Sequence, residues 1–157
     1  MISDRKRGDL ARAVSRHILA YGLYSISELL RHYDFDPVDL LLVHAVMNAN
    51  VAAIMKDPAL DRRFASLEAS EPDSFKKGIS RAALARFLNL PFETVRRRVA
   101  RLKKRAILFE RTDGLIVTQG NEFRFGDNRL LQRTNVILLS RLLRDLARVG
   151  VRKAEDL

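Results

Sequence analysis

One segment, residues 37–56, restricts how this chain can fold, because nearly every position in it is apolar. Asp36 and Pro37 precede it as an N-cap residue and a first-turn proline would, so the segment predicts a helix that begins there. A helix that is apolar all round needs cover all round, from other helices or from a second subunit. Its apolar residues are Val38, Leu40, Leu41, Leu42, Val43, Val46, Met47, Val51, Ile54 and Met55.

Polar residues within this segment favour a buried core helix over a membrane span, and we expect no membrane partner. They are Asp39, His44, Asn48 and Asn50. An asparagine in an apolar helix commonly makes an interface hydrogen bond; a ligand pocket is the alternative use of Asn48 and Asn50.

Helical spacing of apolar residues also predicts helices on either side of this segment. The first covers residues 9–21, with Asp9 as its cap and Gly22 as its stop. The S-x-x-E pattern of Ser25–Glu28 predicts a second, short helix. An apolar-rich helix follows at 128–149, with Gly150 as its stop.

The positive charge of the chain is concentrated in residues 76–111. The chain has 29 basic and 19 acidic side chains and a net charge of +10. Residues 76–111 hold 12 of the basic side chains and only two acids, Glu93 and Glu110, and the rest of the chain has 17 of each sign. A localised basic segment suits a polyanionic partner such as nucleic acid; a solvated, highly charged helix face is the alternative.

The basic segment lies in a region, residues 79–118, where the period changes from helical to alternating. Ser80 precedes a helix that ends near Leu88, a turn at residues 89–91 follows, and a second helix covers about 92–105. Strand-like residues 107–111 and 115–118 then flank the turn residues 112–114. This order predicts a winged helix-turn-helix, in which the hairpin is the wing.

With Val95, Val99 and Leu102 inward, the second helix presents a polar, basic face that can enter the major groove of DNA. There Arg97 can pair with guanine, and Glu93 can accept a hydrogen bond from cytosine. The ring of Phe92 and the methyl of Thr94 can pack on a thymine methyl, and the hairpin tip can reach an adjacent groove or phosphate. The candidate DNA-binding residues are Ser80, Arg81, Phe92, Glu93, Thr94, Arg96, Arg97, Arg98, Arg101, Lys104, Arg111 and Gly114.

The segment from Ile79 to Leu102 resembles the helix-turn-helix core of bacterial winged-helix transcription regulators of the catabolite-activator, MarR and GntR groups. Ser80 matches their helix-opening residue, Ala85 their small packing residue, and Glu93–Arg97 their E-T-V-x-R run. Asn89 stands where these families commonly have glycine, and Phe92 where a polar residue is common. The hairpin at residues 107–118 is similar to their wing, so the resemblance covers about 40 residues. It implies transcription regulation, usually by a dimer on a palindromic operator.

These observations predict a mainly α fold with a winged helix-turn-helix at 79–120. The expected remainder is a helical N-terminal part at 1–57, a linker at 58–78 and a C-terminal helix at 127–150 that packs on the N-terminal part or on a partner subunit. The N- and C-terminal helices would form a helical dimerisation part. We expect a homodimer, because the two long apolar helices exceed what the short helices can cover. The residues expected at its interface are Leu138, Leu142 and Val46.

The expected function is sequence-specific binding of double-stranded DNA by a homodimeric regulator. A winged-helix scaffold for a protein or RNA partner is the alternative. We expect no enzyme, since motifs for nucleophilic, metal-dependent or nucleotide chemistry are absent from the sequence. We expect no cofactor and no metal, because the chain lacks cysteine and its three histidines are not spaced as a ligand pair. A small-molecule effector is possible but has no support in the sequence, and a cytoplasmic location is expected.

Overall fold

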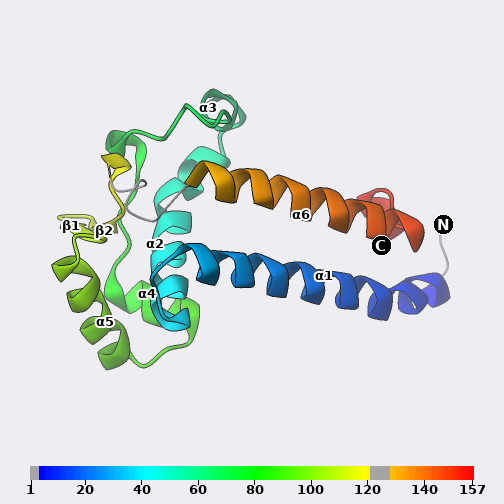
Figure 1. The fold of residues 1–157 in the computed structure, drawn as a ribbon, viewed down its shortest axis with the longest axis horizontal. Helices are drawn as coiled ribbons and strands as arrows, with labels where there is room; N and C mark the ends of the chain where they lie inside the picture. The colour runs from blue at the N-terminus through cyan, green and yellow to red at the C-terminus, as the bar shows by residue number, and fades with distance from the viewer. Residues whose placement is uncertain (1–3, 121–127) are drawn as a thin grey trace. The chain divides into compact units, whose positions relative to one another are not determined.

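The computed structural model describes residues 4–120 and 128–157 and is mainly helical, with one two-stranded antiparallel sheet (Figure 1). The prediction of a mainly α fold with a small hairpin is thereby confirmed. The chain forms two compact units, one from residues 33–128 and the other from the residues before and after them.

Helix α2 (Pro37–Met55) is the central helix of the unit at 33–128, and it begins where the sequence predicts. The Asp36 carboxylate caps it by accepting hydrogen bonds from the backbone N–H groups of Val38 and Asp39, both at 3.0 Å. It packs against α3 (Pro58–Arg63), α4 (Arg81–Leu88), α5 (Phe92–Lys104) and β2 (Gly114–Ile116). The prediction that this helix belongs to the N-terminal part is wrong, because its apolar cover comes from the elements that follow it.

The cover of α2 also explains its composition. Among the described residues, α2 is the one helix long and apolar enough to cross a membrane. Leu42 and Val46 in it are fully buried, as a core helix requires.

Local sequence signals determine the pair α4–α5. Ser80 caps α4, with its hydroxyl accepting from the backbone N–H of Ala83 at 3.1 Å. Asn89 ends α4 in the left-handed conformation, with φ of 51°, as asparagine tolerates. Val95, Val99 and Leu102 of α5 are fully buried, as predicted.

The hairpin comprises β1 (Phe109–Arg111) and β2, which pair antiparallel with Glu110 opposite Leu115. Leu115 also pairs with Ile79, so the chain before α4 lies along the outer edge of β2. This close approach requires glycine: a Cβ on Gly78 would lie 2.7 Å from the backbone of Asp113.

The predicted linker at 58–78 is not a free linker. It contains α3 and a short 3-10 helix (Asp73–Phe75), and its end is fixed to the core. The buried Lys76 side chain donates to the carbonyl of Val117 at 2.9 Å. The Asn50 amide group donates to the carbonyls of Lys77 at 2.7 Å and Leu115 at 3.1 Å, and its oxygen accepts from the N–H of Val117 at 3.0 Å.

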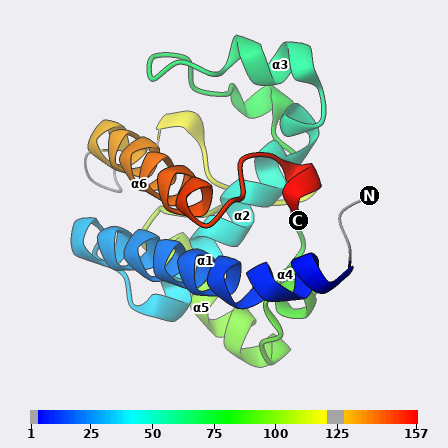
Figure 2. The same cartoon turned by 90° about the vertical axis from the view of Figure 1, so that its right-hand side faces the viewer.

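The second unit contains helices α1 (Asp4–His32) and α6 (Asn128–Arg148), which lie side by side and antiparallel (Figures 1 and 2). The two helices predicted at 9–21 and from Ser25 are one continuous helix, so the prediction of a break between them is wrong. Gly22 does not stop it, because its backbone is not in the left-handed conformation that ends a helix. Gly150, with φ of 96°, follows α6 as predicted.

Replacing Asn50 with alanine should lower the free energy of unfolding by about 2–4 kcal/mol, since it removes three hydrogen bonds and leaves the carbonyl of Lys77 and the N–H of Val117 without this side-chain partner. Asn48→Ala is the matched control, because Asn48 lies exposed on the same helix; it should change the free energy by no more than about 0.5 kcal/mol. Urea unfolding followed by circular dichroism measures both. Equal effects of the two substitutions would contradict the assigned role of Asn50.

Candidate nucleic-acid interface

Four residues of α5 lie opposite its buried stripe and form one line along the helix: Glu93, Arg97, Ala100 and Lys104. All four are exposed. Within the described part of the chain, the side chains of Arg97 and Lys104 form no hydrogen bond or ion pair. The small Ala100 between them allows a partner to approach the helix closely. We refer to this line as the α5 outer face.

Arg98 and Arg101, predicted to contact DNA, instead bind carboxylates at the start of α2. Arg98 donates to Asp36 at 2.7 Å and to Asp39 at 2.9 Å. Arg101 donates to Asp36 at 2.8 Å and also to Asp39, whose side chain is 2% exposed. This flank of α5 faces the N-terminus of α2, although the Arg101 side chain is still 52% exposed, and DNA contact by Arg98 and Arg101 stays a prediction.

These contacts change the titration of Asp36. Burial alone would raise the pKa of this carboxyl. Hydrogen bonds from the Asp39 backbone and from both arginines outweigh this effect and lower the pKa to about 2. Asp36 is therefore ionised at neutral pH and caps α2 while it binds α5.

Acidic residues also neutralise cations on the opposite flank of α5 and beside the hairpin. Glu93 accepts two hydrogen bonds from Arg96, at 2.8 and 2.6 Å. Glu110 of β1 accepts from Arg81 at 2.5 and 2.9 Å and from Lys103 at 2.5 Å. The bonds from Arg81 and Lys103 lower the pKa of Glu110 to about 2.

Arg111 and Gly114, predicted to face DNA, hold the hairpin against the chain before α4. Arg111 donates to Asp113 at 2.7 Å and to the carbonyls of Asp73 at 2.9 Å and Lys76 at 2.8 Å. A Cβ on Gly114 would lie 2.7 Å from the backbone of Ile79, so this residue is at a backbone crossing. Thr112 and Asp113 are the exposed residues of the turn.

The remaining predicted residues differ in exposure. Ser80 is occupied as the cap of α4. Thr94 is half-buried, whereas Phe92 is 51% exposed at the first position of α5.

Three residues of this region were missed as candidates: Phe87, Arg86 and Lys77. Phe87 is 68% exposed, although its helical spacing predicts an inner position, because α4 buries Leu84 and Ala85 and leaves Phe87 on the flank. Arg86 and Lys77 are exposed cations that the basic run itself contains. Arg86 also borders a shallow depression with Ala82, Ala85, Asn89, Leu90 and Phe92.

Most of the charge counted at 76–111 is thus neutralised by acids from elsewhere in the fold. Eight of the 12 basic side chains form ion pairs with carboxylates, several of which come from outside the segment, and four do not within the described residues. The four are Lys77, Arg86, Arg97 and Lys104.

Comparison of the chain with protein-family models, with curated proteins and with solved structures finds no match.

The lowered pKa of Glu110 predicts an acid-dependent loss of stability. A carboxylate with a lowered pKa stabilises the fold fully above its unfolded pKa of about 4 and no longer does so once the pH falls through about 2. Glu110→Gln should therefore lower the free energy of unfolding at pH 6, and its difference from the unmodified protein should vanish near pH 2. Glu68→Gln, at an exposed position of the same unit, is the control. A difference that grows on acidification would contradict the ion-pair assignment.

Proposed function

We propose that this protein binds double-stranded DNA in a sequence-specific manner and regulates transcription, with residues 79–118 acting as a winged helix-turn-helix. The observation that carries the proposal is the α5 outer face, on which Arg97 and Lys104 are exposed and unpaired beside a small residue. The major groove admits an α-helix, and a helix of 13 residues with one polar line suits it.

The ion pairs beside this face support the proposal by fixing the orientation of α5. Arg98 and Arg101 are bound to α2, and Arg81 and Lys103 connect α4 and α5 to the hairpin through Glu110. A reading helix that is held on both flanks presents its outer face in one orientation, as readout of base edges requires.

Individual roles follow from position along the helix. Arg97 would pair with guanine, and Lys104 would contact a phosphate. Phe92 and Thr94, in the first turn of α5, would lie where such helices contact base edges. Glu93 would read cytosine only after releasing Arg96.

The exposed rings of Phe87 and Phe92 support a second candidate, a scaffold that binds a protein or RNA. Both rings lie in the region of the turn between α4 and α5, where apolar side chains can anchor a partner. Loss of binding when Phe87 is replaced, with Arg97 dispensable, would favour this candidate.

Arg97→Ala and Lys104→Ala should each weaken binding to a duplex selected from random sequences. For Arg97→Ala we expect a loss of about 1–3 kcal/mol, together with relaxed preference at one base pair. Lys104→Ala should weaken binding to all duplex sequences by the same factor. Arg62→Ala removes an equal charge from the exposed surface of α3 and is the control. If the Arg97 variant keeps both affinity and preference in fluorescence anisotropy, α5 is not the reading helix.

We also propose that the protein is a homodimer, through a surface other than the one predicted. Val46 is fully buried, and Leu138 and Leu142 face α1, so these residues are unavailable. Two helices cannot bury apolar residues on their outer sides, and large exposed patches mark interfaces. A second copy of the α1–α6 pair would cover the exposed residues Leu19, Leu23, Ile26, Val136, Leu139 and Leu143.

Light scattering at micromolar concentration should give twice the chain mass of 17.9 kDa. Charged substitutions at Leu139 and Leu143 should halve it, whereas Arg144→Gln should not. The monomer mass for the unmodified protein would overturn the dimer.

A further inference from the structure

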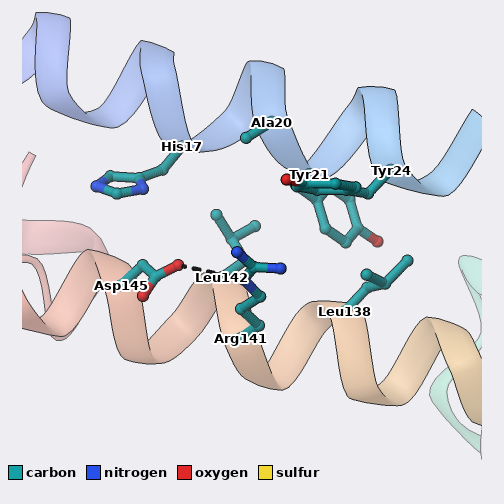
Figure 3. Close-up of a pocket in the computed structure, with 8 residues that line it drawn as sticks. All are labelled: His17, Ala20, Tyr21, Tyr24, Leu138, Arg141, Leu142 and Asp145. Carbon is teal, nitrogen blue, oxygen red and sulfur yellow. Dashed lines mark ion pairs between the residues drawn. The ribbon is translucent and has the colours of Figure 1, made fainter.

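We propose that the α1–α6 pair contains a binding site for a small organic anion with an apolar ring, such as an aromatic carboxylate. The site is a cavity of about 210 Å³ between the two helices (Figure 3). Each helix contributes four residues to it: His17, Ala20, Tyr21 and Tyr24 from α1, and Leu138, Arg141, Leu142 and Asp145 from α6.

Arg141 provides the positive charge of the site. Its guanidinium group lies 5.1 Å from the ring centre of Tyr24 and is therefore held by the aromatic face. Among the described residues its one carboxylate partner is Asp145, 3.9 Å from Arg141 Nε, and Asp145 also pairs with Arg148 at 3.1 Å. The guanidinium group thus keeps donors for a ligand, and its planar fork matches a carboxylate.

The electrostatic surroundings favour an anion. Residues 1–32 and 129–157 together contain 13 basic and six acidic side chains. An excess of one sign raises the local concentration of oppositely charged ligands.

The remaining groups suit a ring attached to the anionic group. Tyr21 and Tyr24 offer aromatic faces and hydroxyl donors, and His17 offers a ring nitrogen at the other end of the cavity (Figure 3). Ala20, Leu138 and Leu142 form the apolar walls. The cavity is smaller than the roughly 300–1,000 Å³ typical of sites for drug-sized ligands, so it suits a single-ring molecule.

Packing alone does not account for these residues. A seam between two helices is normally filled by apolar side chains. Here the seam carries an imidazole, a guanidinium and a carboxylate around the small Ala20, and the space beside them stays open. Polar groups that converge on an apolar cavity are the usual composition of a ligand site.

The test uses the full-length protein with benzoate as the probe, benzyl alcohol as its neutral analogue and acetate as an anion without a ring. Isothermal titration calorimetry should show that benzoate binds more tightly than either. Arg141→Gln should weaken benzoate binding by about tenfold or more, as loss of a charge-assisted hydrogen bond does. Arg144→Gln, an exposed arginine of the same helix outside the cavity, should leave the affinity unchanged.

Ala20→Leu should fill the cavity and abolish binding while helical content, measured by circular dichroism, is retained. Equal affinities for benzoate and benzyl alcohol, equal losses for the two arginine variants, or no benzoate binding at millimolar concentration would each overturn the proposal. A change of oligomeric mass in Ala20→Leu would also overturn the proposal. It would indicate that, in the unmodified protein, a side chain from a second copy occupies the cavity in place of a ligand. These readouts are independent of DNA binding.

Discussion

The buried amide of Asn50 connects α2 to the segment before α4 and to the strand that follows the hairpin turn. It donates to the carbonyls of Lys77 and Leu115 and accepts from the N–H of Val117; the Leu115 carbonyl also accepts from the N–H of Ile79. A two-stranded hairpin is marginal on its own, so its position depends on such contacts with the core. Leu115 and Ile116 of β2 are also buried. The hairpin is consequently a fixed part of this unit.

Ion pairs decide which cations remain available on the α4–α5 surface. Exposed pairs contribute little to stability, at most about 1 kcal/mol each. Their larger consequence is geometric, because each one fixes a long side chain and cancels a charge. Asp39 is different: its carboxylate is buried and requires Arg98 and Arg101 as partners, so the flank of α5 is tied to α2. On α5, the unpaired cations Arg97 and Lys104 then lie on the outer face.

The sequence predicted correctly those features that depend on neighbouring residues. Asp36, Ser80, Asn89 and Gly150 mark helix ends through local hydrogen bonds or backbone conformation, and each acts as expected. The buried residues of α5, Val95, Val99 and Leu102, could be predicted from the helical spacing of apolar residues.

Features that depend on distant residues could not be predicted. The carboxylates that bind Arg98 and Arg101 are about 60 positions away in the chain. The backbone crossing at Gly114 involves Ile79, and no spacing rule indicates it. The continuity of α1 through Gly22 also escaped prediction, since glycine both ends helices and is tolerated within them.

The salt dependence of DNA binding tests the central claim most directly. Each neutralised phosphate contributes about −0.9 to the slope of the logarithm of affinity against the logarithm of salt concentration. The four cations of residues 76–111 that form no ion pair within the described residues predict a slope of about −3 to −4 per chain, measured by anisotropy on a selected duplex. A slope near zero, or no affinity for duplex DNA, would contradict DNA binding by this surface. A slope near −11 per chain, as expected if all 12 basic side chains of residues 76–111 contacted phosphates, would contradict the neutralisation of the other eight by ion pairs.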